Sequence, residues 1–403
     1  MQQEYDVLIV GGGLAGSCLA LALHDSGMKV AIVEATTEEQ RSKAAIGNRA
    51  LALAYGTTKM LEALNSWQSV KHKATPIKQI HISDQGHFAK SRLSADKEGV
   101  EALGYVITAR DIEQAVTEQV QKTDVSMICP GRLIGLIAGD EQMLVSLKVG
   151  EESVNVSAKL IVGADGGDSS VRRLLGIQQT SRDYQQKAIV TTVKPSLGHG
   201  NIAFERFTAT GPLALLPTRN NCFSVIWTRS DEQTDQLMAG GDESFIEALQ
   251  ECFGYRLGAL EMVAPRFAFP LSLIRAGTMV TGRGVIVGNA AHQLHPVAGQ
   301  GFNLGLRDVV QLAEMLIQQF QSGGDIGNKE FLSCYANARA SDHDKTVNFT
   351  DGIVRIFSNE WLPVAASRGL GLFMIDHISV AKSYLTRQAM GMGERLPRVG
   401  NRR

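Results

Sequence analysis

The first 34 residues alternate between apolar runs and a glycine-rich turn, in the pattern of a strand, a helix and a second strand. Tyr5–Val10 is an apolar run rich in β-branched residues, as expected of a strand buried on both faces of a parallel sheet. A helix over 15–25 follows, Gly27 ends it, and residues 29–33 form the next strand. The chain is therefore predicted to begin with a βαβ unit.

The turn between the first strand and the helix has the spacing of a dinucleotide fingerprint. Gly11, Gly13 and Gly16 give G-x-G-x-x-G, and bare amides at the helix start suit a pyrophosphate. Glu34 ends the second strand, where a carboxylate can bind ribose hydroxyls and disfavours a 2′-phosphate. A glycine-rich packing turn is the alternative, and the fingerprint does not choose between FAD and NAD. The turn residues predicted to contact the cofactor are Gly11, Gly13, Leu14, Ala15 and Gly16.

A second strand, turn and helix follow at 159–176. Residues 160–162 form the strand, Asp165-Gly166 the turn, and Ser169 the N-cap of a short helix that carries Arg172 and Arg173. This segment is either a capped turn with a local Asp–Arg pair or a second cofactor contact.

The third segment, 288–308, is rich in glycine and nearly uncharged. A strand over 284–287 leads into it, and an amphipathic helix from about Asn303 to Phe320 leads out. Gly299-Gln300-Gly301 therefore lies at a second positive helix end. His292 and His295 show no third or fourth metal ligand at convincing spacing, so we expect no metal; each is a hydrogen-bonded loop histidine or a proton relay.

Between these segments lie stretches with the pattern of strands. They predict a mostly antiparallel sheet with a turn at 219–221, and they cover 77–87, 188–193, 202–217, 222–228 and 264–273. Phe207, Leu213 and Leu215 are predicted to wall a substrate pocket, with ordinary sheet core as the alternative. No residue in the sequence stands out as a catalytic base.

The C-terminal stretch 355–390 is helix-like and apolar, and basic residues flank it. We favour the interpretation that this stretch forms a helix pair packed on the core. The alternative is contact with a membrane surface or with a partner of a biosynthetic complex.

Composition narrows the class of protein. The 403 residues suffice for two or three domains, and the net charge of −1 gives no field that would recruit nucleic acid. Five scattered cysteines without a CxxC favour free thiols in a reducing compartment. Acidic residues precede the uncharged run 7–23, so we do not expect it to be a signal peptide; we expect a cytoplasmic protein, with a peripheral position on the inner membrane as the alternative. The oligomeric state is left open.

In order and spacing, the three segments resemble the FAD-dependent aromatic hydroxylases of the p-hydroxybenzoate hydroxylase type. The matches are Gly11–Gly16, the Asp-Gly stretch 163–172, and the stretch 288–308 with Pro296. Residues 47–57, 207–217 and 295–308 narrow the resemblance to the hydroxylases of ubiquinone biosynthesis, above all those acting on 2-polyprenyl-6-methoxyphenol.

The resemblance implies a Rossmann-like FAD-binding domain, an α/β fold, interleaved with a mostly antiparallel substrate domain and followed by a C-terminal helical segment. The predicted FAD-binding domain comprises 1–75, 99–183 and 274–350, and the substrate domain comprises 76–98 and 184–273. Residues 351–403 form the C-terminal helical segment.

The chemistry implied by the resemblance is hydroxylation of a polyprenylated phenol through a flavin C4a-hydroperoxide, with NAD(P)H as transient reductant. Pro296, Gly299, Gln300 and Gly301 would position the flavin ring and the peroxide. Further contacts carried over to the cofactor are Glu34, Arg49, Arg110, Asp165, Gly166, Asn289, Gly301, Phe302 and Asn303.

One departure from the resemblance concerns charge. The family has an aspartate beside the ribityl chain where this sequence has Asn289, a neutral group that still donates and accepts hydrogen bonds. Its neutrality is expected to make flavin reduction slightly easier. Other functions left open are hydroxylation of another ring position or phenol, and a non-catalytic FAD-bound scaffold subunit.

Overall fold

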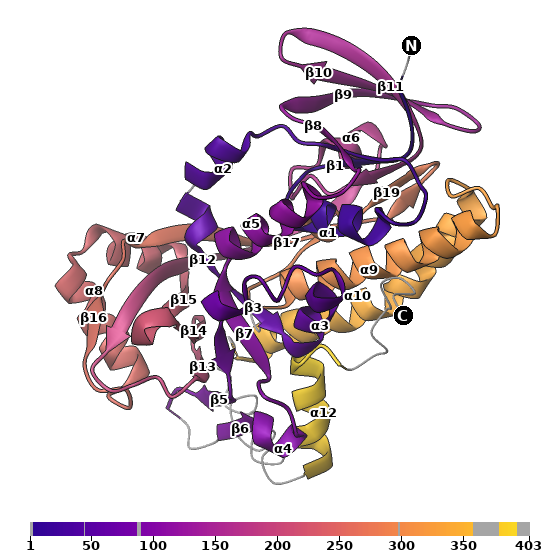
Figure 1. The fold of residues 1–403 in the computed structure, drawn as a ribbon. Coiled ribbons are helices and arrows are strands. Elements are labelled where there is room, and N and C mark those ends of the chain that lie inside the picture. Colours follow the sequence, from indigo (N-terminus) through magenta and orange to yellow (C-terminus); the bar gives the residue numbers. More distant parts are fainter. Residues whose placement is uncertain (1–2, 44, 87–89, 297–298, 358–378, 393–403) are drawn as a thin grey trace.

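The computed structural model describes residues 3–43, 45–86, 90–296, 299–357 and 379–392, and it has two main sheets (Figure 1). The first, here the parallel sheet, has the order β18-β19-β11-β1-β2-β8, with β11, β1, β2 and their neighbours β19 and β8 parallel. Its strands are β1 (Gln3–Val10), β2 (Val30–Val33), β8 (Ser126–Ile128), β11 (Glu152–Gly163), β18 (Val280–Thr281) and β19 (Gly284–Ile286). The predicted βαβ unit is confirmed, with helix α1 (Leu14–Leu23) between β1 and β2.

Both faces of this sheet are covered, which explains why its strands read as unbroken apolar runs. On one face, Val7 and Ile9 pack with helices α1, α5 (Ala109–Val120) and α9 (Gln300–Gln321). On the other face, Leu8 and Val10 pack against an antiparallel extension of β11, made of β9 (Gly131–Ala138) and β10 (Met143–Val149). The carboxyl ends of β1, β2 and β11 are left open toward the second sheet.

The second sheet, here the antiparallel sheet, has the order β20-β17-β12-β15-β14-β13-β5-β6, and β16 also pairs with β12. Its pairs are antiparallel except β13 with β5, so the predicted mostly antiparallel sheet is confirmed. The strands are β5 (Gln79–Asp84), β6 (Lys90–Ser94), β12 (Gln179–Pro195), β13 (Ile202–Thr208), β14 (Gly211–Thr218), β15 (Cys222–Ser230), β16 (Leu260–Met262), β17 (Phe267–Ala276) and β20 (His292–Gln293). Strands from 79–94 and from 179–276 thus join in one sheet, although β12 and β17 run a few residues past the predicted domain boundaries.

A small sheet and the remaining helices complete the fold. The small sheet has β7 (Gly104–Thr108) between β3 (Ala50–Ala54) and β4 (Thr75–Ile77). Helices α7 (Asp231–Ala239) and α8 (Asp242–Phe253) pack on the antiparallel sheet, and α10 (Lys329–Phe357) lies along α9 (Figure 1). The others are α2 (Glu38–Lys43), α3 (Tyr55–Ala63), α4 (Ala95–Glu98), α6 (Ser170–Leu174) and α12 (Ser379–Ala389), with short 3-10 turns η1 (Ala45–Asn48), η2 (Lys71–Lys73), η3 (Arg219–Asn221) and η4 (Gly288–Ala290).

Two further expectations can be compared with these elements. The five cysteines are free thiols, as predicted. Helix α12 packs on the body of the protein: Met390 joins a buried cluster with Leu93 and Leu103, and its carbonyl accepts the Gly56 amide at 2.8 Å. Residues 358–378 and 393–403 lie outside the described part of the chain, so the predicted helix pair is tested only for this one helix.

Candidate active site

A cavity of about 1630 Å³ lies between the open strand ends of the parallel sheet and the inner face of the antiparallel sheet. Small-molecule sites usually measure about 300–1,000 Å³, so this space suits a large cofactor together with a second ligand. At one end its lining comes from the ends of β1 and β2, the turn after β11 and the start of α1. At the other end it comes from β5, β12, β13, β14, β15 and β17, with Leu385 and Ala389 of α12.

The glycine fingerprint divides into residues that line the cavity and one that packs the helix. Gly11, Gly13, Leu14 and Ala15 line the cavity, and a Cβ on Gly13 would have nothing within 4 Å. Gly16 faces the strand instead, where a Cβ would lie 1.9 Å from the carbonyl oxygen of Gly11. The start of α1 has no side-chain cap, so its amides and its dipole point at the open space.

Glu34 lies at the end of β2 on the cavity wall, where the ribose of a dinucleotide is expected. Its carboxylate accepts the Gly12 amide and the Thr36 amide, both at 2.7 Å, and Arg41 lies 3.7 Å away. These contacts fix the carboxylate beside the fingerprint turn. The geometry agrees with the predicted ribose contact.

Asp165 and Gly166 line the cavity too, but the Asp165 carboxylate is already engaged by its own turn. It accepts hydrogen bonds from Ser169 Oγ at 2.5 Å and from the amide and hydroxyl of Ser170 at 2.7 Å. Ser169 caps α6 as predicted, accepting the Arg172 amide at 2.9 Å. Arg172 donates to the Ala290 and Gly167 carbonyls, and so ties this turn to η4. The local Asp–Arg pair of this segment is formed by Asp168 and Arg173.

The two arginines carried over from the resemblance take different positions. Arg49 lines the cavity, while Arg110 is not among the described residues that line it. Arg110 packs over Gly47, where an added Cβ would lie 3.3 Å from its Nε, and its cofactor contact stays a prediction. Nothing in the sequence pointed to Glu113, which also lines the cofactor end of the cavity. Burial raises the pKa of Glu113, and the nearby Arg49 and Arg41 oppose that rise.

Residues from 288–296 and 299–303 form one wall of the cavity. All seven residues predicted here line it: Asn289, Pro296, Gly299, Gln300, Gly301, Phe302 and Asn303. Gly299 precedes α9 with φ +60, and a Cβ there would lie 3.1 Å from that of Ala52, so glycine is required for the close approach. A Cβ on Gly301 would meet nothing within 4 Å, and Gly299 gives the helix no side-chain cap.

The Asn303 side chain is structural, since it holds this wall to the small sheet. Its Oδ1 accepts the Ala54 amide at 2.9 Å and the Thr57 hydroxyl at 2.6 Å. Its Nδ2 donates to the carbonyls of Ala52 at 3.0 Å and Gly299 at 2.7 Å. All four bonds of the amide are used within the protein, so a cofactor contact from Asn303 would have to come from its backbone.

On the substrate side, one of the three predicted residues lines the cavity. Phe207 does so, but Leu213 and Leu215 do not. Both leucines are fully buried in the cluster formed with α7 and α8, on the opposite face of the sheet. Because side chains alternate along a strand, Ala214 and Leu216 face the cavity instead, which corrects the prediction by one residue.

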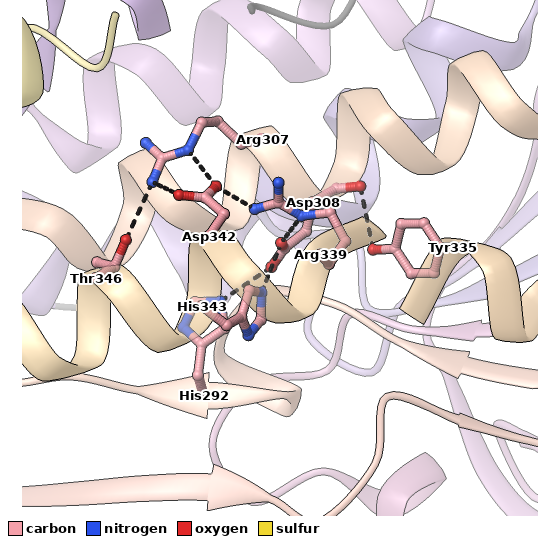
Figure 2. A network of polar contacts seen from close by, with 8 residues as sticks. All are labelled: His292, Arg307, Asp308, Tyr335, Arg339, Asp342, His343 and Thr346. Carbon is pink, nitrogen blue, oxygen red and sulfur yellow. Dashed lines mark hydrogen bonds and ion pairs between the residues drawn. The ribbon is translucent and has the colours of Figure 1, made fainter. Parts of the chain in front are cut away.

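His292 and His295 are held in different surroundings. His295 lines the cavity edge-on to Tyr184, while fully buried His292 contacts Asp308 at 3.0 Å (Figure 2). The Asp308 carboxylate is also 2.7 Å from both His343 and Arg339, at the contact of α9 with α10. Sequence spacing gave His292 no further metal ligand, but the fold brings the ligand atoms of Asp308 and His343 within 4.8 Å of it and of each other.

Charge explains the stability of this network better than a metal does. Burial would raise the pKa of Asp308, but His343 and the Arg339 guanidinium hold it well below its usual value. Arg339 already neutralises the carboxylate, and it also donates to Asp342 at 2.6 Å. The network thus fixes the start of β20, beside the cavity wall, to helices α9 and α10 (Figure 2).

The cofactor end of the cavity fits FAD in shape and in donors. Neither α1 nor α9 has a side-chain cap at its start, and Gly13 and Gly301 leave open space beside these two helix starts. The Glu34 carboxylate lies at the end of β2, where a ribose would bind. The fold and this site define a class: a flavoprotein with a Rossmann-like cofactor domain and a ligand chamber under an antiparallel sheet.

Comparison with known proteins identifies the family. The FAD binding domain family matches residues 4–350, and the chain belongs to it. The ubiquinone hydroxylase UbiL of Rhodospirillum rubrum is 36% identical and aligns with 98% of this chain and 92% of its own length. The human ubiquinone biosynthesis monooxygenase COQ6, mitochondrial, is 27% identical over 94% of this chain and 91% of its own. The p-nitrophenol 4-monooxygenase PnpA of Pseudomonas putida shares the fold, with a TM-score of 0.79 at 17% identity over 98% of this chain and all of its own.

Proposed function

We propose that the chain is an FAD-dependent, NAD(P)H- and O₂-using monooxygenase that hydroxylates the ring of a polyprenylated phenol in ubiquinone biosynthesis. The observation that carries the proposal is the continuity of one cavity from the dinucleotide fingerprint to an apolar chamber. The relatives named as ubiquinone hydroxylases and monooxygenases, which align over most of the chain, support the same reaction.

FAD would lie with its pyrophosphate at the start of α1 and its ribose beside Glu34, and with its ring against Pro296 and Gly299–Gly301. When bound, the flavin supplies the reducing equivalents and the oxygen-activating chemistry. The protein contributes position and charge: the amides at the start of α9 present positive potential to the side of the ring that they face.

The far chamber suits a ring that carries an apolar tail. Its wall is formed by residues such as Phe207, Ala214 and Leu216, and it continues past Ile80 and Ile82 to Leu385 of α12. An isoprenoid chain would gain about 25 cal/mol for each Å² of apolar surface that it buries there. Such a mostly apolar lining favours an apolar ligand over a hydrophilic one of the same size.

Contact with a membrane surface is proposed as well, because the substrate tail resides in lipid. None of the described helices is long and apolar enough to span a bilayer. Leu385 and Ala389 bring α12 to the cavity, so the C-terminal segment is the part of the chain suited to receive a substrate from a membrane or from a partner.

The test is turnover by the purified flavoprotein. We expect flavin absorbance, and NAD(P)H oxidation that rises when a short-chain 2-prenyl-6-methoxyphenol is added, with a hydroxylated ring as product. Tight flavin binding without turnover on this phenol or its analogues would refute the proposed reaction and favour a non-catalytic scaffold.

A further inference from the structure

Glu205 is the unusual residue of the substrate chamber. It lies on β13 between Ala214 of β14 and Ile82 of β5, and its side chain lines the cavity. Every other cavity-lining residue that the described strands of the antiparallel sheet contribute is uncharged. The chamber therefore presents one ionisable group from its sheet wall.

The Glu205 carboxyl is held in apolar surroundings. Its Oε1 atom is shielded from solvent and has no hydrogen-bond partner among the residues that the structure describes. Burial raises the pKa of Glu205 to about 7, with no charged group contributing to the shift. A buried acid without a partner costs stability, so a ligand that donates to it would satisfy a group the fold leaves unsatisfied.

The charged neighbours on adjoining strands are not among the residues that line the cavity. Arg206 points to the other side of β13 and donates to the Cys252 carbonyl at 2.8 Å. His81 of β5 packs edge-on to Phe204, and burial lowers its pKa to about 4. Asp84 ends β5 with its side chain buried, and β14 carries no ionisable residue. Glu205 is thus the group whose protonation governs charge in this part of the chamber.

We propose that Glu205 is the catalytic base that accepts the hydroxyl proton of the bound phenol; this inference rests on the proposed function. The phenol O–H bond breaks, an O–H bond forms on the Glu205 carboxylate, and the electron pair stays on the substrate oxygen. No electrons leave the substrate in this step. The negative oxygen makes the ring carbons more nucleophilic, and Glu205 returns the proton to that oxygen after the ring C–H proton has left.

Other acids and bases of the cavity are less suited to this role. Burial lowers the pKa of His295 to about 4, so it is a weak base at neutral pH. Glu34, Asp165 and Glu113 lie at the cofactor end, away from the sheet wall, and the first two are also held by hydrogen bonds to nearby amides or hydroxyls. General base catalysis is most effective when the pKa of the base lies near the working pH, which Glu205 satisfies.

The experiment compares wild type, Glu205→Gln and Glu205→Asp as holoenzymes with bound FAD, and it uses Glu251→Gln on the exposed surface of α8 as control. Product formation is measured with a 2-prenyl-6-methoxyphenol and with its ring-fluorinated analogue, whose hydroxyl is more acidic. NAD(P)H oxidation without phenol and flavin absorbance show that the cofactor site is intact.

We expect Glu205→Gln to slow hydroxylation about 100-fold while flavin content and phenol-free NAD(P)H oxidation stay unchanged. The wild-type rate should rise with pH through about 7, where the carboxyl ionises, and the rise should vanish in Glu205→Gln and persist in Glu205→Asp. The fluorinated phenol should narrow the gap between wild type and Glu205→Gln, because its proton leaves without a base.

A Glu205→Gln rate within about threefold of wild type, or an unchanged pH profile, would overturn the inference. So would an equal deficit on both phenols, which would mark a merely structural role. Failure of the proposed function looks different, since wild type itself would then hydroxylate neither phenol. Should Glu205→Gln fail to fold, the pH profile of Glu205→Asp against wild type decides.

Discussion

Two glycines of the first turn, three residues apart, have different roles: Gly16 allows the helix to pack on the strand, and Gly13 leaves space for the cofactor. A Cβ on Gly16 would lie 1.9 Å from the Gly11 carbonyl oxygen, whereas real Cβ atoms essentially never approach below 3.0 Å. A Cβ on Gly13 would meet nothing within 4 Å, although Gly13 lines the cavity. Gly16→Ala should therefore damage the fold, and Gly13→Ala should damage the cofactor site.

The size of each effect follows from the geometry. In Gly16→Ala, α1 must move from the strand by about 1.1 Å, the difference between 3.0 and 1.9 Å, and nine of its ten residues are buried. Overpacking of this kind costs about 1–3 kcal/mol, and the upper end applies because the obstructing atom is backbone. Gly13 has an extended backbone with φ −73, so alanine there costs less than about 1 kcal/mol, as a poorer helix cap.

The assay measures both quantities on both variants. Thermal or denaturant unfolding of the apoprotein reports the fold, and fluorescence titration with FAD reports the site. We expect Gly13→Ala to unfold close to wild type but to bind FAD at least tenfold more weakly, a loss of about 1.4 kcal/mol, because its methyl group occupies pyrophosphate space. Wild-type FAD affinity in Gly13→Ala, or wild-type apoprotein stability in Gly16→Ala, would refute this reasoning.

Three further predictions concern the cavity wall and its support. Asn303→Ala breaks four buried hydrogen bonds and should lower the free energy of unfolding by about 2–4 kcal/mol, while exposed Asn337→Ala should change it by less than about 0.5 kcal/mol in the same denaturant titration. Asp308→Asn removes one of the two buried carboxylates that Arg339 contacts and should cost about 3–5 kcal/mol; an equal cost for the exposed Asp344→Asn would contradict this. Because the fold depresses the pKa of Asp308, its carboxylate stabilises the protein fully above pH 3.8, the pKa in the unfolded chain, and this stabilisation is lost as the pH falls below that value. The difference in free energy of unfolding between wild type and Asp308→Asn should therefore shrink in acid. Asn289→Asp adds a negative charge at the cavity wall and should lower the flavin midpoint potential by about 20 mV, equivalent to about 1 kcal/mol for two electrons. A dye-coupled titration measures this potential, and an unchanged value would show that residue 289 does not tune the flavin.

Much of the cofactor end could be predicted because its signals are local in the sequence. The fingerprint turn, the Ser169 cap and the glycine-led start of α9 depend on residues a few positions apart, and each is found close to where it was expected, although α9 begins at Gln300 and not at Asn303. The antiparallel strands and the turn at Arg219–Asn221 were predictable for the same reason, since alternation and turn residues act over short range.

The substrate chamber depended on tertiary contacts. Side-chain alternation along β14 predicts that Leu213 and Leu215 share one face of the strand. Only the packing of α7 and α8 on that face leaves the opposite face, with Ala214 and Leu216, to line the cavity. Glu205 gave no signal, because one glutamate in a strand looks like a solvated edge until β5, β14 and the cavity enclose it.

The sequence by itself determined the family, the cofactor and the class of reaction, because pyrophosphate binding needs bare backbone at fixed spacing and leaves a contiguous trace. The tertiary structure decided which side chains face the substrate and which charges are paired. His292, Asp308 and His343 meet from three different elements, β20, α9 and α10, and Glu205 loses its water only when separate strands close around it. Burial is a property of the assembled fold, and burial sets the pKa and the reactivity of such groups.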